Sequence, residues 1–182
     1  MPRDEMTPAG LIARCAKIDL LILDVDGVLT DGSIAYTDAG AELKTFHVRD
    51  GSGLKLWAKL GKKAGIITGR RSGIVDRRAA ELDIASVIQG ADNKHAALTQ
   101  MLASLGMEAD RVCAMGDDLP DVPVLRTCGL AVAVADACAE AKEDADYVTR
   151  APGGRGAVRE VIELILRAQG RWQEIIARYR DV

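Results

Sequence analysis

Hydrophobic positions along the chain follow two patterns, short unbroken runs and longer stretches with a helical spacing. The run at residues 18–23 is apolar except for Asp19, which is typical of a strand buried on both faces. Similar short runs predict further strands at residues 64–67, 85–88, 111–115, 130–134 and 147–149. The stretches between them have a helical pattern and predict helices at residues 72–82, 93–105, 120–126 and 137–143.

Capping signals define two more helices. Thr7 and Pro8 suit the cap and the first residue of a helix that reaches residue 15 or 16. Asp50 is expected to cap a helix over residues 51–60.

The last two elements come from an alternating pattern and from a helical one. Residues 34–37 and 43–48 alternate around Asp38-Ala39-Gly40, which predicts a β-hairpin. From residue 157 to about residue 179 the pattern is helical, with a break expected near Gly170.

Strands that alternate with helix-length segments form βαβ units, in which the strands pair in parallel. We therefore expect an α/β fold with a doubly wound, mostly parallel, Rossmann-like sheet and the hairpin as a small insertion. No repeat, low-complexity segment or linker divides the sequence. A single domain over residues 1–182 is expected, with a hairpin flap at about 33–48 and a C-terminal helix and tail at about 157–182.

The composition argues against several classes of function. The sequence has 24 Lys and Arg residues and 27 Asp and Glu residues, so it lacks the basic excess typical of nucleic-acid or anionic-membrane binding. Aromatic residues make up only 3%, too few for a base-stacking platform. The N-terminal residues do not resemble a signal peptide, and no apolar run is long enough to cross a bilayer. We expect a cytoplasmic protein without a nucleic-acid or membrane partner.

Histidine and cysteine chemistry is also disfavoured. The two histidines, His47 and His95, are too few for a histidine-rich zinc site. The four cysteines have no metal-ligand spacing, lie in apolar or alanine-rich stretches and are expected to be buried thiols: Cys15, Cys113, Cys128 and Cys138. If the protein is an enzyme, carboxylates are expected to carry its chemistry.

Polar segments occur at the ends of four predicted strands. Because ligands bind at the carboxyl ends of the strands in an open parallel sheet, these segments are expected to meet at one edge. They are Asp24-Val25-Asp26-Gly27, Thr68-Gly69-Arg70, Lys94 and Gly116-Asp117-Asp118-Leu119-Pro120-Asp121. Each is a weak signal alone, since such residues also form turns and helix caps. Their joint occurrence, in this order and at strand ends, favours a functional site.

The residue types in these segments suit phosphoryl transfer. Asp24 and Asp26 are two positions apart, and two neighbouring carboxylates supply a nucleophile and a general acid. With Asp117 nearby, the site is too acidic for an anionic substrate unless a hard cation such as Mg²⁺ binds there. Thr68 offers a hydroxyl group and Lys94 a positive charge for phosphate oxygens. The set fits transfer of a phosphoryl group to a carboxylate, followed by hydrolysis.

These four segments resemble the motifs of the haloacid dehalogenase superfamily of phosphohydrolases, and the resemblance extends over nearly the whole chain. It implies Asp24 as nucleophile, Asp26 as general acid and base, and Thr68 and Lys94 as phosphate binders. It also implies that Mg²⁺ is held by the Asp24 carboxylate, the Asp26 main-chain carbonyl and Asp117. Asp118 and Asp121 would then support the metal ligands without binding the ion themselves.

Further motifs resemble the 3-deoxy-D-manno-octulosonate 8-phosphate phosphatase family, which makes a free sugar acid for lipopolysaccharide synthesis. They are DGVLTDG at 26–32, FHVRDG at 46–51 and PGGRGAVREV at 152–161. The resemblance implies substrate contacts at Asp26, His47, Val48, Arg49, Asp50, Gly51, Lys55, Gly69, Arg70, Arg78 and Lys94. The additional cations suit a substrate that carries a carboxylate besides its phosphate. Lys55 departs from the arginine expected there, which leaves the identity of the sugar acid open.

Three alternatives remain. A phosphatase for a nine-carbon keto acid, such as a sialic acid 9-phosphate, would use the same mechanism with a different pocket. A phospho-acceptor signalling module also gathers Asp, Thr and Lys, but there the phosphorylated Asp follows the third strand. A catalytically idle regulatory domain is disfavoured because the catalytic positions are intact.

The spacing of the motifs leaves no room for a cap domain over the site. The hairpin and one helix fill the interval between Asp24 and Thr68, and a helix and a strand fill the interval between Thr68 and Lys94. Because an open site weakens catalytic electrostatics, we expect another subunit to close it. The family resemblance implies a homotetramer. One subunit's hairpin, and its C-terminal tail with Arg171, Arg178 and Arg180, would border the neighbour's site.

Overall fold

The computed structural model describes residues 7–84 and 86–180. Its centre is a six-stranded sheet in the order β5-β4-β1-β6-β7-β8, and every pair of neighbours is parallel. The strands are β1 (Leu20–Leu23), β4 (Lys63–Thr68), β5 (Ser86–Gln89), β6 (Val112–Gly116), β7 (Leu130–Ala133) and β8 (Tyr147–Val148). The chain reverses its direction of winding at β1, which confirms the predicted doubly wound sheet.

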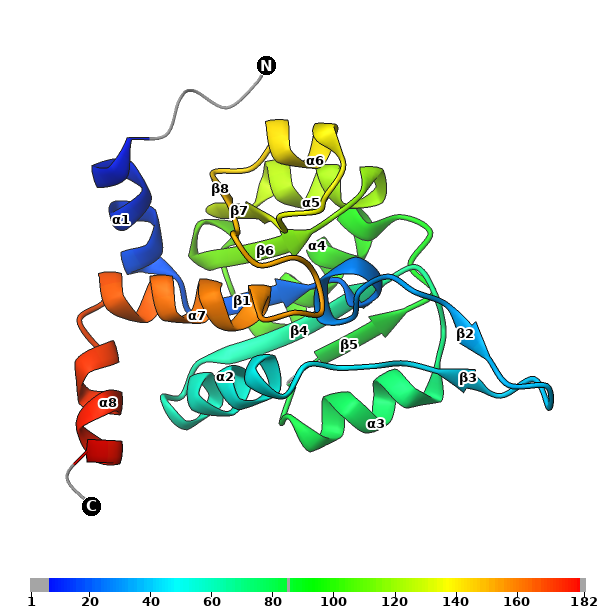
Figure 1. The fold of residues 1–182 in the computed structure, drawn as a ribbon. Helices are drawn as coiled ribbons and strands as arrows, with labels where there is room; N and C mark the ends of the chain where they lie inside the picture. The colour runs from blue at the N-terminus through cyan, green and yellow to red at the C-terminus, as the bar shows by residue number, and fades with distance from the viewer. Residues whose placement is uncertain (1–6, 85, 181–182) are drawn as a thin grey trace.

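Helices cover both faces of this sheet (Figure 1). They are α1 (Pro8–Lys17), α2 (Val48–Lys59), α3 (Gly73–Glu81), α4 (Lys94–Leu105), α5 (Val122–Thr127), α6 (Ala139–Glu143), α7 (Ala157–Ala168) and α8 (Trp172–Arg180). Helix α7 packs against α1 and α2 on one side, and α4 packs against α5 on the other. Among the described residues, no helix combines the length and the apolar character needed to cross a bilayer.

Local sequence signals explain most of the helix boundaries. The Thr7 side chain accepts a hydrogen bond from the Gly10 amide and caps α1, as predicted. The left-handed Gly106 ends α4. The long C-terminal helical pattern is broken near Gly170, also as predicted, because this residue adopts a φ of 69° between α7 and α8.

The predicted helix start at Asp50 is wrong. Helix α2 begins at Val48 with His47 as its cap residue, and Asp50 lies inside the first turn. The Asp50 side chain is only 1% exposed and accepts hydrogen bonds from the amides of Gly156 and Arg159 at the start of α7. Asp50 therefore caps a different helix from the one that its local sequence indicated.

The predicted hairpin is present, but its paired strands are short. Strands β2 (Ala35–Tyr36) and β3 (Glu42–Leu43) pair antiparallel. The hairpin projects beyond the body of the sheet, at the right of Figure 1. Its position beside the carboxyl ends of the strands brings it to the edge where the candidate residues gather.

A glycine-rich loop at residues 152–156 holds the acidic loop that follows β1. The amide of Gly154 donates to the carbonyl of Val28 at 2.9 Å. A Cβ atom on Gly153 would lie 1.7 Å from the carbonyl oxygen of Gly27, so no larger residue fits this approach. The PGGRG segment therefore fixes the backbone next to Asp24 and Asp26.

Candidate active site

A cavity of about 380 Å³ lies at the carboxyl ends of β1, β4 and β6. It is lined by Asp24, Asp26, Thr68, Gly69, Arg70, Ala91, Asp92, Lys94, Asp117, Asp118, Pro120 and Asp121. All four polar segments singled out in the sequence therefore meet in one place. The structure also brings together every residue that the sequence predicted for the nucleophile, the acid, the phosphate contacts and the metal ligands.

Asp24 lies at the bottom of this cavity and directly follows β1. Its side chain is buried, and Oδ2 lies 3.0 Å from the Lys94 ammonium. The same ammonium donates a hydrogen bond of 2.7 Å to Asp121 Oδ1. Lys94 thus joins two buried carboxylates across the ends of two strands.

Burial, followed by the crowding of negative charge, raises the pKa values of Asp24 and Asp117. Burial, and then the charge of Asp121, raise the pKa of Asp24 to about 6, although Lys94 lowers it in part. Burial, followed by the charges of Asp121 and Asp24, raises the pKa of Asp117 to about 7. Burial alone would lower the pKa of Lys94, but the charges of Asp24 and Asp121 raise it above its usual value. Carboxyl groups therefore outnumber the two cationic side chains, Arg70 and Lys94, in the lining of the cavity.

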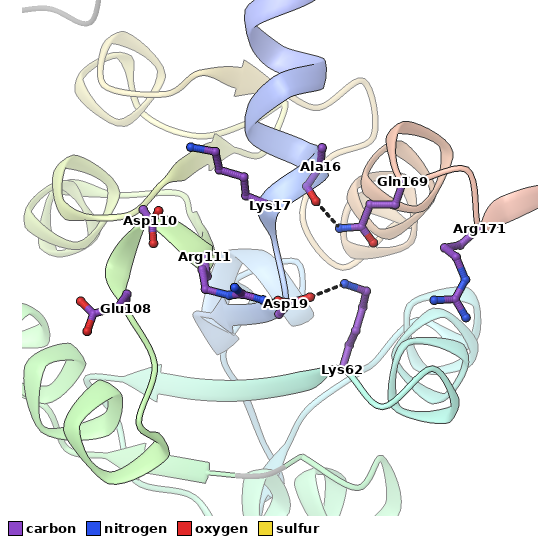
Figure 2. A pocket seen from close by; sticks show the side chains of 9 residues that line it. All are labelled: Ala16, Lys17, Asp19, Lys62, Glu108, Asp110, Arg111, Gln169 and Arg171. Carbon is purple, nitrogen blue, oxygen red and sulfur yellow. Dashed lines mark hydrogen bonds and ion pairs between the residues drawn. The ribbon is translucent and has the colours of Figure 1, made fainter.

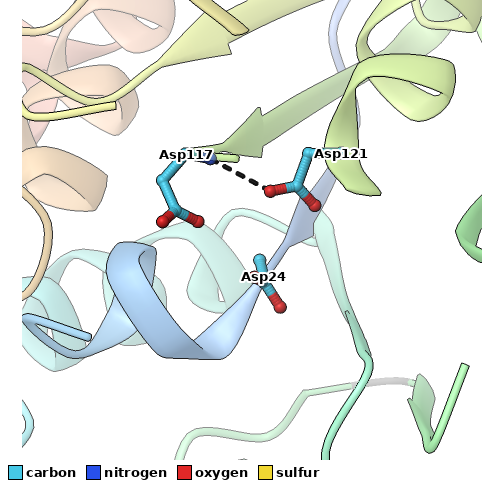
Figure 3. A group of neighbouring side chains, drawn as sticks. All are labelled: Asp24, Asp117 and Asp121. Atoms are coloured by element: carbon cyan, nitrogen blue, oxygen red, sulfur yellow. Dashed lines mark hydrogen bonds between the residues drawn. The ribbon is translucent and has the colours of Figure 1, made fainter. Parts of the chain in front are cut away.

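The oxygen atoms present fit a hard divalent cation. Carboxylate oxygens of Asp24, Asp117 and Asp121 all lie within 4.8 Å of one another (Figure 3). Asp24 Oδ1 and Asp117 Oδ1 are buried and have no hydrogen-bond partner in the described part of the chain. A buried carboxylate oxygen without a donor is costly unless a cation binds it. Magnesium is the cofactor that this donor set and the raised pKa values support.

Asp121 has a different task from the other two carboxylates. Its Oδ2 accepts hydrogen bonds from the amides of Asp117 and Asp118, at 3.0 and 3.3 Å, while its Oδ1 is bonded to Lys94. Asp121 therefore holds Lys94 and the backbone of the loop after β6 in place. That Asp121 supports the metal ligands without binding the ion stays a prediction.

Two charged residues of the hairpin reach the site and were missed by the sequence analysis. Glu42 accepts hydrogen bonds from the hydroxyl of Ser72 at 2.6 Å and from Arg70 at 2.8 Å, and these bonds hold its pKa below the usual range. The ammonium of Lys44 donates to Asp26 Oδ1. Residues two apart on a strand point to the same side, so the sequence pairs these two charges, but it does not indicate that their side of the hairpin faces the site.

The remaining predicted substrate contacts lie outside this cavity. They are His47, Val48, Arg49, Asp50, Gly51, Lys55 and Arg78. Val48 and Arg78 line a second cavity of about 330 Å³ together with Lys44, which also contacts Asp26. Lys55 pairs with Asp83 at 3.7 Å. Because Asp50 is buried, a substrate contact there would have to come from the backbone. The roles of these seven residues stay predictions.

A larger cavity of about 750 Å³ lies at the opposite edge of the sheet, next to the amino ends of β1, β4 and β6 (Figure 2). Its central carboxylate, Asp19, is paired with both Lys62 and Arg111. The predicted catalytic residues are absent from its lining. This cavity is therefore not the candidate active site.

The fold and the site define the class of protein. A doubly wound sheet that gathers paired aspartates, a threonine, a lysine and a second acidic loop is the arrangement of the haloacid dehalogenase-like hydrolases. The family model of that description matches residues 74–162.

Individual relatives narrow the assignment. The chain is 49% identical over 166 residues to the 3-deoxy-D-manno-octulosonate 8-phosphate phosphatase of Escherichia coli strain K12, covering 91% of this chain and 88% of that protein. The protein belongs to the family of 3-deoxy-D-manno-octulosonate 8-phosphate phosphatases.

Solved structures agree with this assignment. The phosphatase of this name from Moraxella catarrhalis, in complex with magnesium, phosphate and 3-deoxy-D-manno-octulosonate (KDO), is similar at a TM-score of 0.93 and 43% identity, covering 95% of this chain and 99% of that one. The corresponding structure from Yersinia pestis gives a TM-score of 0.88 at 47% identity, over 90% and 88% of the two chains.

Proposed function

We propose that this protein is a Mg²⁺-dependent phosphomonoesterase that hydrolyses KDO 8-phosphate to the free sugar acid and inorganic phosphate. The observation that carries the proposal is the pair of buried, unpartnered oxygens on Asp24 and Asp117 beside Lys94. This arrangement suits a nucleophile that needs a cation next to it. The choice of substrate follows from the activity for which the relatives are named.

In the first half of the reaction, a carboxylate oxygen of Asp24 attacks the phosphorus atom. The bond between phosphorus and the sugar oxygen breaks, and Asp26 gives its proton to the departing alkoxide. The products are an aspartyl phosphate on Asp24 and the free sugar acid.

In the second half, Asp26 accepts a proton from a water molecule as that water attacks the phosphorus atom. The acyl phosphate bond breaks, so Asp24 returns as a carboxylate and inorganic phosphate leaves. Bound Mg²⁺, held by Asp24, Asp117 and the Asp26 carbonyl, would supply positive charge that offsets the negative charge of the phosphoryl group.

Thr68 and Lys94 are the groups that we assign to the phosphoryl oxygens. Both are buried, Thr68 at the end of β4 and Lys94 at the start of α4, and both line the cavity beside Asp24. Gly69 and Arg70 continue the same wall. Fixed donors of this kind lose little free energy to reorganisation when charge develops in the transition state.

A nine-carbon keto acid phosphate is the second candidate substrate. The observation that keeps it open is Lys55, which replaces an expected arginine by a point charge and is partly exposed beside Asp83. Phosphate release from the eight-carbon and nine-carbon acids, measured side by side with Mg²⁺ and with a chelator, tests the proposal. We expect faster turnover of the eight-carbon substrate and none in chelator. Preference for the nine-carbon acid would overturn the substrate assignment, and activity in chelator would overturn the metal requirement.

We further infer that the single domain assembles as a homotetramer in which a neighbour closes the site. The support is a set of exposed apolar side chains on and beside the projecting hairpin: Ile34, Tyr36, Leu43 and Val48. Light scattering tests this inference. A mass four times the 19.4 kDa chain mass is expected, and a fully active monomer would refute it.

The reaction is assigned to the cytoplasm. Cys15, Cys113 and Cys138 are thiols and not halves of disulfides, which suits a reducing compartment. Fractionation of cells that express the protein tests the assignment, because recovery in the periplasmic or membrane fraction would contradict it.

A further inference from the structure

The buried ammonium of Lys44 is the least expected feature of the hairpin. The residue directly follows β3 on a projecting arm, yet its side chain is only 2% exposed. Its Nζ donates to Asp26 Oδ1 and lies 3.5 Å from Glu42 Oε1. Burial of an ammonium group is costly unless anions surround it, so the two carboxylates explain why Lys44 points inward.

Lys44 belongs to a closed ring of alternating charges. From Lys44 the ring passes to Glu42, from Glu42 to Arg70 at 2.8 Å, and from Arg70 Nε back to Asp26 Oδ2 at 3.7 Å. The last of these separations is too long for a hydrogen bond. The hairpin is thus fastened to the acidic loop and to the end of β4 of its own chain.

The ring makes the two oxygens of Asp26 inequivalent. Oδ1 is bonded to Lys44, whereas Oδ2 is only near Arg70 and receives no hydrogen bond from the described residues. A carboxyl group anchored at one oxygen cannot rotate freely about its terminal bond. While Lys44 is bonded to Oδ1, Oδ2 is the Asp26 oxygen that can exchange a proton with a group bound in the cavity.

We propose that Lys44 is a positioning residue that fixes the Asp26 carboxyl so that Oδ2 meets the leaving-group oxygen. The inference rests on the proposed function, in which Asp26 protonates that oxygen. Lys44 itself does not touch the substrate in this account. Its ammonium is occupied by Asp26 and Glu42 and is nearly inaccessible.

Misplacement of the general acid slows the reaction most for strongly basic leaving groups, whereas a general distortion of the site slows all leaving groups alike. A leaving group that is a strong base depends on proton donation, while a stable phenolate departs without it. Positioned acid catalysis contributes about 10²–10⁴-fold. If Lys44 supplies part of that positioning, its loss will slow phenyl phosphate by about tenfold or more and 4-nitrophenyl phosphate by less than about threefold.

The test is kcat/KM for a series of aryl phosphates whose leaving groups increase in basicity. None of these substrates has the sugar acid's carboxylate, so a change in the sugar pocket affects them alike. The variants are Lys44→Met, which keeps an unbranched apolar side chain without the ammonium, and Lys44→Arg, which keeps the charge. Asp26→Asn serves as the reference for a lost acid, and Lys59→Met, at an exposed lysine of α2, is the matched control.

We expect the dependence on leaving-group basicity to steepen in Lys44→Met and Asp26→Asn. Lys44→Arg should have a slope of kcat/KM against leaving-group basicity between those of wild type and Lys44→Met. Lys59→Met should have the wild-type slope. Glu42→Gln tests whether attachment of the hairpin alone explains the effect, because it weakens the contacts of residue 42 with Arg70, Ser72 and Lys44 but keeps both partners of the bond between Lys44 and Asp26. It should lower all rates to a similar extent and leave the slope unchanged.

Failure of this inference is distinguishable from failure of the proposed function. If Asp26→Asn steepens the slope and neither Lys44 variant does, Lys44 has no positioning role and the proposed function stands. If Asp26→Asn leaves the slope unchanged, Asp26 is not the acid and the inference falls with that assignment. A wild-type enzyme that releases no phosphate from any ester would refute the proposed function itself.

Discussion

Replacement of Asp24 by Asn should abolish turnover and at the same time stabilise the metal-free protein. The variant removes the nucleophile but keeps the shape of the side chain. It also removes a charge that is only 8% exposed and lies near Asp121. A rise of the carboxyl pKa from 3.8 to about 6 means that the ionised form costs the folded state about 3 kcal/mol. This net cost already includes the favourable contact with Lys94, so we expect a gain of up to about 3 kcal/mol.

The pH dependence identifies the origin of this gain. A carboxyl whose pKa is raised by folding is neutral and harmless below about pH 4, and its destabilising effect develops as the pH rises toward 6. The variant should therefore match wild type at pH 4 and exceed it at pH 8. For a chain of this length, a gain of 1 kcal/mol corresponds to about 2–4 °C in melting temperature.

Thermal unfolding in chelator, followed by circular dichroism at both pH values, is the assay. Asp92→Asn is the matched control, because Asp92 lines the same cavity but is exposed, and its change should be small. Added Mg²⁺ should raise the melting temperature of wild type more than that of the variant. A variant less stable than wild type at pH 8, or a difference that does not vary with pH, would refute this reasoning.

Three further substitutions follow from the same geometry. Lys94→Met leaves two buried carboxylates uncompensated, so we expect loss of turnover and about 3 kcal/mol of stability in urea unfolding, with a larger loss at pH 8 than at pH 5. Gly153→Ala puts a Cβ against the Gly27 carbonyl and should lower both kcat and melting temperature; Gly73→Ala, where a Cβ meets nothing within 4 Å, is the control. Arg78→Ala should raise KM for the sugar acid phosphate far more than for 4-nitrophenyl phosphate, and equal effects would exclude a role in carboxylate binding.

The sheet could be predicted from the sequence because its strands are nearly continuous apolar runs. The strands β1, β6 and β7 are buried along their whole length, and burial on both faces is what such a run requires. The start of α2 could not be predicted in the same way. Asp50 has the local signature of a cap, but its hydrogen bonds go to α7, more than a hundred positions away in the sequence. Only the tertiary fold decides between those two uses of one carboxylate.

The same distinction applies to the site. The four polar segments were predictable because parallel strands end at a common edge. Glu42 and Lys44 were not, because a hairpin carries no rule that says which of its faces meets the sheet. Their apolar neighbours indicated an oligomer contact, while Lys44 contacts Asp26 in the loop after β1 and Glu42 contacts Arg70 just beyond β4 of the same chain. The roles of Val48 and Arg78 depend on what binds in the neighbouring cavity, which both residues line.

If Asp24 carries the phosphoryl group during turnover, covalent trapping will find that group on this residue. Enzyme mixed with KDO 8-phosphate and Mg²⁺ would be acid-quenched within a single turnover, digested and mapped by mass spectrometry. We expect a single phosphoryl group on the peptide that contains Asp24. Hydroxylamine should remove this group, and the Asp24→Asn enzyme should lack it. A phosphoryl group on any other residue, or steady phosphate release by the Asp24→Asn enzyme, would contradict this role of Asp24.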